Sequence, residues 1–136
     1  MGTVFSGKPI TVFPELAYFT GVTSTSSTFR GCSSLVEVII PENVTTIGAY
    51  TFYQTSIRKL VLPAKLTAIN GNVFQGSGNL TTTIIYATNP PTISSQARSW
   101  LRGTIYVPDD SVEAYRAAAE WINIASRIVG ISEYDG

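Results

Sequence analysis

Two consecutive stretches of this chain carry nearly the same order of aromatic, aliphatic and proline residues. The first runs from residue 29 to 48 and the second from residue 52 to 70. Pro41 and Pro63 occupy the same place in the two stretches, 22 residues apart, and a third, degraded copy begins at Phe74. A unit this short buries its apolar side chains only by stacking on its neighbours. The repeat therefore predicts a solenoid with one continuous core.

Alternation within each unit predicts which side chains point into this core. Val38 and Ile40 alternate with Glu37 and Ile39, as expected of a strand with one buried face. Proline then ends the strand because it cannot donate to a ladder. We therefore predict parallel strands with four inward columns, and we interpret Thr83 as the mark of a terminal rung with weaker packing. The columns are Leu35/Ile57/Leu80, Val38/Leu60/Thr83, Ile40/Leu62/Ile85 and Ile47/Ile69/Ile93.

A second short extended segment follows each proline, at 44–47 and at 66–69. Gly48 and Asn70 come directly after these segments. Both residue types tolerate a left-handed backbone, so the chain is expected to turn there.

The N-terminal region is predicted to close one end of the array. Residues 8–21 are interpreted as a cap, with an extended lead-in to Phe13 and a short helix starting at Pro14. The Ser/Thr run at residues 23–28 admits two interpretations: a loop, or a weakened rung with Thr25 at the place of Ile47.

The other end is predicted to be closed by a helix. Residues 94–103 lack the repeat pattern, and Ile105 and Val107 restore it. Asp109, Asp110 and Ser111 then offer N-cap side chains for a helix over residues 112–121. The residues at helical spacing that define its apolar stripe are Val112, Tyr115, Ala119 and Ile122.

These boundaries give one domain over residues 1–136. Its parts are an N-terminal cap with a degraded first unit (8–28), the repeat units (29–108) and a C-terminal helical cap (109–136). A last extended segment is expected at 128–131 and a frayed tail at 132–136.

The composition excludes several kinds of catalytic, metal-binding and nucleic-acid-binding site. The chain has no histidine, one cysteine, and nine basic against nine acidic side chains. Imidazole-based catalysis, an internal disulfide and cysteine zinc sites are therefore excluded, and a neutral chain offers no electrostatic footprint for nucleic acid. Cys32 is interpreted as a buried structural thiol, because Thr55 and Ser77 continue its column. No catalytic residue, cofactor or metal is predicted.

Carboxylates are interpreted as structural. Asp109 and Asp110 precede a helix and are assigned to capping rather than to a metal. Glu37 and Glu42 are assigned to solvated surface. Glu37 and Lys59 occupy equivalent outward places, with Thr82 next, which predicts an ion pair between neighbouring strands.

The candidate binding residues are apolar. Ile39, Val61, Ile84 and Tyr106 form an outward column, which is either an exposed stripe for a partner or for self-association, or a surface covered by a neighbouring segment. Trp100 is the candidate exposed aromatic residue, able to stack on a sugar, whereas Trp121 is expected to pack the C-terminal helix onto the core.

The repeat also carries a family resemblance. The form Phe-x-x-Cys-x-x-Leu-x-x-Val-x-Ile-Pro-x-x-Val-x-x-Ile-Gly, as it stands over residues 29–48, resembles the BspA-like leucine-rich repeat of bacterial and protist surface proteins. The segment 105–115 resembles the one that often ends such arrays. The resemblance covers residues 16–131, and it departs from the family pattern at Thr55 and Ser77, where the family has cysteine. It implies a mainly β, short right-handed leucine-rich-repeat solenoid of about 22–23-residue units with an α cap.

The resemblance also implies a function. Such proteins are secreted or surface-displayed and engage proteins, cells or glycans, which predicts a non-enzymatic protein- or glycan-binding or adhesion module. The alternative is a purely structural terminal segment of a larger surface or phage-fibre-like protein, and an enzyme is a third. The sequence shows neither a signal peptide nor a membrane span. We therefore expect either a cytoplasmic protein or, as the resemblance implies, a mature or truncated segment of an extracellular or cell-surface chain.

Overall fold

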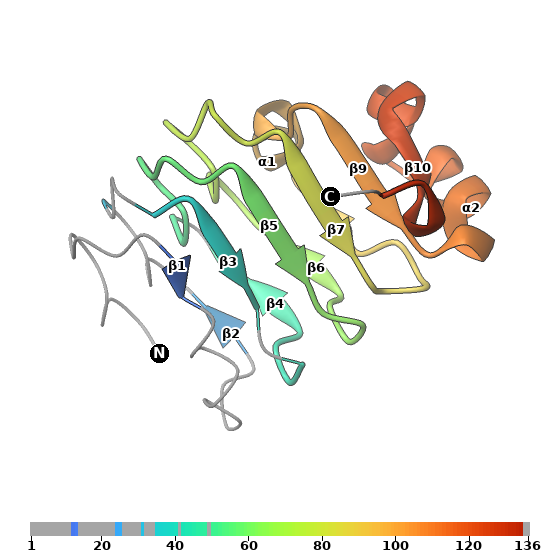
Figure 1. Cartoon of the computed structure of the whole chain (residues 1–136), viewed down its shortest axis with the longest axis horizontal. Coiled ribbons are helices and arrows are strands. Elements are labelled where there is room, and N and C mark those ends of the chain that lie inside the picture. Colours follow the sequence, from blue (N-terminus) through green and yellow to red (C-terminus); the bar gives the residue numbers. More distant parts are fainter. Residues whose placement is uncertain are drawn as a thin grey trace.

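Two parallel sheets make up the framework of the protein (Figure 1). The computed structural model describes residues 12–13, 24–25, 31, 35–40, 42–48 and 50–134. Within these residues, the larger sheet has six strands in the order β1-β3-β5-β7-β9-β10 and the smaller has four in the order β2-β4-β6-β8. Up to β8 the described strands alternate between the two sheets, one strand in each per repeat unit.

The strands are short. Those of the larger sheet are β1 (Val12–Phe13), β3 (Glu37–Ile39), β5 (Lys59–Leu62), β7 (Thr82–Ile85), β9 (Thr104–Val107) and β10 (Ile128–Gly130). Those of the smaller sheet are β2 (Ser24–Thr25), β4 (Thr46–Ile47), β6 (Ala68–Ile69) and β8 (Thr92–Ile93).

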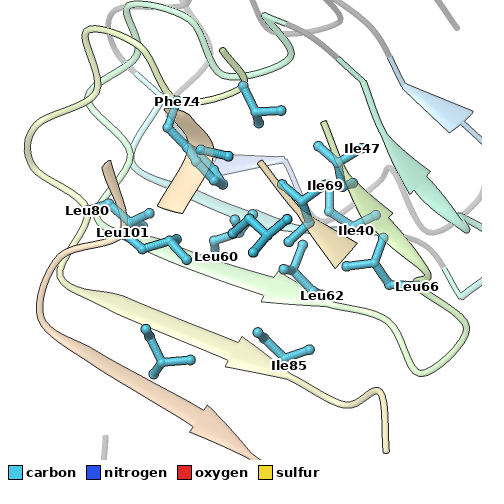
Figure 2. Close-up of a cluster of buried hydrophobic side chains, with 14 of the residues drawn as sticks. Ile40, Ile47, Leu60, Leu62, Leu66, Ile69, Phe74, Leu80, Ile85 and Leu101 are labelled. Carbon is cyan, nitrogen blue, oxygen red and sulfur yellow. The ribbon is translucent and has the colours of Figure 1, made fainter. Parts of the chain in front are cut away.

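The register agrees with the sequence repeat. Leu60 pairs with Val38 on one side and with Thr83 on the other, and Ile69 lies between Ile47 and Ile93. All members of the four predicted inward columns are buried, and their apolar members belong to one hydrophobic cluster that joins the two sheets (Figure 2). The prediction of parallel strands with these inward columns is confirmed.

Phenylalanine and small polar residues fill the corners of the units. Phe52 and Phe74 are fully buried, and their rings stack with centroids 5.8 Å apart. Beside them Thr55 and Ser77 are buried, with their hydroxyl oxygens 3.0 Å apart, and both donate to the carbonyl of Phe52. The column predicted for Cys32 is therefore buried at these two places, while Cys32 itself lies outside the described residues.

Thr83 is not at a terminal rung, so that interpretation was wrong. It lies in β7, which is paired on both sides, by β5 and by β9. It is fully buried, and its hydroxyl has no hydrogen-bond partner within the described part of the chain. A polar group without a partner in a core costs free energy.

The predicted left-handed turn positions were also wrong. Asn70 donates its backbone N–H to the carbonyl of Ile47 at 2.9 Å, so it still belongs to the ladder. The left-handed residue is the next one, Gly71, with φ 57°. Three further residues have a left-handed backbone, and each comes two residues after a phenylalanine: Gly31, Gln54 and Gly76.

The described N-terminal residues form a rung. Val12 pairs with Glu37 through β1 and β3, and Thr25 pairs with Ile47 through β2 and β4. Of the two interpretations of the Ser/Thr run, the weakened rung is the one observed. The helix expected at Pro14 lies outside the described residues.

The segment without repeat pattern contains a short helix, α1 (Ser95–Trp100). Ser94 caps it, because its Oγ accepts from the backbone N–H of Ala97 at 3.1 Å. Ala97 and Leu101 are buried in the common core. The segment thus takes part in packing although it does not follow the repeat.

The C-terminal helix is shorter than predicted. A 3-10 turn, η2 (Asp109–Ser111), leads into α2 (Val112–Ala117), and the 3-10 segment η3 (Trp121–Arg127) follows. Six residues correspond to about 600° of helix rotation, so one continuous helix would point Trp121 about 120° away from Tyr115. The break at Ala118 allows both residues to be fully buried, and it leaves Ile122 58% exposed and Ala119 exposed, contrary to the predicted stripe.

The predicted capping role of Asp109 and Ser111 was wrong. Ser111 Oγ donates to the carbonyl of Thr88 at 2.8 Å, and Asp109 Oδ1 accepts from the backbone N–H of Ser132 at 3.0 Å. The predicted extended segment is present as β10, which pairs with β9. The tail is not frayed from residue 132, because η4 (Ile131–Glu133) and Tyr134 pack against β9.

Candidate binding surface

The four predicted stripe residues form one column on the outer face of the larger sheet. Ile39 pairs with Val61, Val61 with Ile84, and Ile84 with Tyr106. Each follows a residue that points into the core, so alternation directs these side chains outward. The column thus crosses β3, β5, β7 and β9 at the spacing of paired strands, about 4.8 Å.

The four side chains differ in exposure. Ile39 is 41% exposed, Val61 and Tyr106 are half-buried, and Ile84 is only 4% exposed. The column is therefore open at the β3 end and closed at β7.

The closure comes from the C-terminal segment. The ring of Tyr134 lies 5.0 Å from the ring of Tyr106 on β9 and 5.2 Å from Nζ of Lys59 on β5. Since β7 is between these strands, Tyr134 lies over β7 and covers its outward residue. Each of the two alternatives thus holds for one half of the column: one half is covered by a segment of the chain, and the other half is exposed.

A groove occupies the open half. It has a volume of about 590 Å³ and lies where β3, β5 and β7 end. Its apolar lining includes Ile39, Val61, Pro63 and Tyr86, and two exposed charged residues also line it, Glu42 and Lys65. We call this surface the outer groove.

Tyr86 was missed by sequence reasoning. It is 49% exposed and follows β7, with its backbone N–H donating to the carbonyl of Leu62 at 3.1 Å. The signal that identifies it is the same alternation, since Thr82, Ile84 and Tyr86 are the outward residues of one strand and its extension.

The predicted ion pair lies beside the column. Nζ of Lys59 is 3.7 Å from a carboxylate oxygen of Glu37, and both side chains are about one-third exposed. Lys59 also pairs in register with Thr82, as expected. The pKa of Lys59 is raised, mainly by its side-chain hydrogen bond with Tyr134 and to a lesser extent by the charge of Glu37, while desolvation acts in the opposite direction. Such a partly exposed pair contributes at most about 1 kcal/mol.

Neither tryptophan is fully exposed. Trp100 ends α1 half-buried against the core, with the guanidinium of Arg102 5.6 Å from its ring. The expectation of an exposed Trp100 is not met, because α1 directs its indole inward. Trp121 is fully buried, as predicted, and donates from Nε1 to the carbonyl of Pro91 at 2.8 Å.

Polar chemistry is sparse on this surface. The described residues contain no group of three or more His, Cys, Asp or Glu side chains that could hold a metal ion. No helix in the described part of the chain has both the length and the apolar character needed to cross a membrane. What the surface offers is apolar contact area with a few charges around it.

Comparison with known proteins identifies the repeat. No curated protein matches the chain. A family model described as "BspA type Leucine rich repeat region (6 copies)" matches residues 19–99, more than half of the chain. Leucine-rich repeat domains generally mediate protein binding, this family is associated with bacterial surface proteins, and its repeats are typically non-enzymatic. The chain belongs to the BspA-type leucine-rich repeat family.

Proposed function

We propose that the chain is a short, capped leucine-rich-repeat solenoid that acts as a non-enzymatic, protein-binding module of a bacterial surface or secreted protein. The two parallel sheets and the family support the solenoid. We further propose that the C-terminal region from residue 109 to 136 acts as the cap. Tyr115 donates to the carbonyl of Ala87 at 2.7 Å, and Trp121 to that of Pro91, so this region is bonded to the loop that follows β7.

The outer groove is the observation that carries the proposal. Ile39, Tyr86 and Ile122 are the large hydrophobic residues that are exposed in the described part of the chain, and two of the three line the groove. Clustered exposed apolar residues mark interaction sites more often than scattered ones do. A concave surface turns such a cluster into a site that a partner side chain can enter.

The lining favours a protein over a glycan. A sugar presents many hydroxyl groups, which a binding site matches with several polar side chains. The groove is mostly apolar, and its charged groups are those of Glu42 and Lys65. A protein side chain buries apolar surface there without leaving hydroxyl groups unpaired.

A second candidate is a structural terminal segment of a larger surface or fibre-like protein. The cover that Tyr134 places over Ile84 favours it, because the chain already closes part of its own outer face. In that case an adjoining part of the same protein fills the outer groove, and no separate partner exists.

Surface variants test the proposal. Val61→Lys places a charge in the outer groove, whereas Thr104→Lys places one on the same face of the sheet, on β9 and outside the groove. Both are surface changes, so each should alter the free energy of unfolding by no more than about 0.5 kcal/mol. Binding to extracellular-matrix and bacterial surface-protein arrays should be lost with Val61→Lys and kept with Thr104→Lys.

Three other outcomes would decide against it. Binding that survives in Val61→Lys removes the outer groove from the function. Binding lost after glycosidase treatment of the arrays, but not after protease treatment, identifies a glycan instead. An unfolded Val61→Lys protein would place Val61 in the core and contradict the outward assignment, and Ile39→Lys provides a second test of the same surface.

A further inference from the structure

We propose that the outer groove takes one aromatic side chain of a partner peptide, flanked in that peptide by one acidic and one basic residue. This inference rests on the proposed protein-binding function and assigns a chemical class to the partner. The occupant would sit on the face of the sheet, beside the place that Tyr134 occupies within the same molecule.

The protein itself shows how this face accepts an aromatic ring. Tyr134 stands edge-on to Tyr106, with ring planes at 71°, and the ammonium of Lys59 lies over its ring. The contact therefore combines three features: an outward residue of the column beneath the ring, a second aromatic ring at its side, and a lysine. Edge-to-face pairs and cation–π contacts are both attractive.

The outer groove offers the same three features with different residues. Ile39 and Val61 belong to the same column as Tyr106 and form the floor. Tyr86 supplies the neighbouring ring and Lys65 the ammonium. A volume of about 590 Å³ leaves room for an aromatic side chain together with part of its backbone.

The charges around the groove define the residues next to that aromatic side chain. Glu42 lies in the turn after β3 and Lys65 in the turn after β5, and both are exposed. A peptide with one charge of each sign finds an opposite charge at each of these two residues, whereas a peptide with two like charges meets one repulsion. Exposed charge pairs contribute little affinity, so they select among peptides while the buried ring provides most of the binding.

Strand addition is not the mode of binding here. The groove lies on the face of the sheet, and β5 at its centre is already paired on both sides, by β3 and by β7. Its backbone groups are therefore not available to an added strand, which in other proteins binds at an open edge. Recognition must come from side chains.

Four short peptides test the inference. The probe is acetyl-Gly-Lys-Gly-Trp-Gly-Glu-Gly-amide, and the comparisons carry two Glu, two Lys, or Ala in place of Trp. Each is titrated into the isotope-labelled full chain, and the backbone amide shifts are followed by NMR. We expect shifts at Ile39, Val61 and Tyr86. Replacement of Trp by Ala should weaken binding by at least about tenfold, and two like charges should weaken it by about two- to fivefold.

Charge reversal of the protein gives the sharper result. Lys65→Glu makes both groove charges negative, so the preferred peptide should change to the one with two Lys. Glu42→Lys makes both positive, so the preference should change to the peptide with two Glu. Thr104→Lys, on the same face but outside the groove, should leave the order of preference unchanged.

The contradicting outcomes are distinct from those of the proposed function. The inference fails if no peptide shifts the groove amides, if Ala replaces Trp without loss, or if the shifts appear at Tyr106 and Tyr134 instead. If Val61→Lys still abolishes array binding in that case, the proposed function stands and only the class of ligand is wrong. If Val61→Lys leaves array binding intact as well, both fail.

Discussion

The ring of Tyr134 stands edge-on to the ring of Tyr106, with the two centroids 5.0 Å apart. Tyr106 lies on β9, and Lys59, whose ammonium lies over the same Tyr134 ring, lies on β5. One aromatic side chain near the end of the chain thus contacts residues on both sides of β7. Because of this contact, the outer face is divided into a covered part around Ile84 and an open part around Ile39.

Removal of this ring should open the covered part. Tyr134→Ala is expected to lower the free energy of unfolding by about 1–2.5 kcal/mol, the sum of one edge-to-face pair and one cation–π contact. Urea denaturation measures the change, and hydrogen exchange at Ile84 should become faster. Tyr134→Phe keeps the ring and should retain most of the stability. Equal losses in both variants would assign the effect to the hydroxyl rather than to the ring.

The inward and outward assignments predict opposite results for adjacent residues of β5. Leu60→Ala should lower the free energy of unfolding by about 2–5 kcal/mol, because it leaves a cavity in a central strand. That is a large part of the roughly 7–20 kcal/mol expected for 136 residues at about 0.05–0.15 kcal/mol per residue. Val61→Ala, on the outer face, should cost much less. Equal shifts of the two melting curves would contradict the alternation.

At position 83, in the core, a residue other than the natural threonine should give a more stable protein. Thr83→Val keeps the shape of the side chain and removes a buried hydroxyl that lacks a partner within the described residues. The variant should be more stable by about 1 kcal/mol in chemical denaturation. Thr82→Val, the neighbouring outward change, should stay within about 0.5 kcal/mol of the parent. Destabilisation by Thr83→Val would show that the hydroxyl does have a partner.

Tyr115 should make the protein sensitive to alkaline pH. Its burial raises the pKa of its hydroxyl well above the usual value of about 10. The folded state then holds a proton that the unfolded state loses, so stability is complete below pH 10 and falls as the pH rises above it. Unfolding free energies measured between pH 9 and pH 11 should show this decline, and Tyr115→Phe should reduce its slope.

The Tyr115→Phe variant also needs a reference at neutral pH. It removes the hydrogen bond to the carbonyl of Ala87, which should cost about 1 kcal/mol at every pH below 10. The effect of Tyr115 ionisation is therefore the slope of the unfolding free energy against pH, and not the constant difference in that free energy between the two proteins. A parent protein whose stability is flat up to pH 11 would mean that the hydroxyl ionises without unfolding.

Alternation and the repeat were sufficient to place the core. Leu60 and Val61 are assigned to opposite faces by a two-residue period, and the 22-residue offset aligns Leu60 with Val38. These are properties of neighbouring residues and of stacking, so they can be inferred from the order of residues alone. The same inference gave the pairing of Glu37 with Lys59.

The candidate site could be predicted only in part. The column from Ile39 to Tyr106 follows from the repeat, but its four members look alike in the sequence while their exposure differs tenfold between Ile39 and Ile84. The difference depends on where Tyr134 lies, and no local pattern specifies a contact between the tail and a sheet face.

The C-terminal region shows the same limit. The sequence by itself determined the repeat, the strand faces, the inward columns and the family. Only the tertiary structure decided that the helix stops at Ala117, where the burial of Trp121 under the carbonyl of Pro91 outweighs the good helix propensity of the residues that follow. It also decided which half of the outward column is open. Strand alternation is set by neighbouring residues, whereas helix ends and surface cover are set by contacts between residues far apart in the chain.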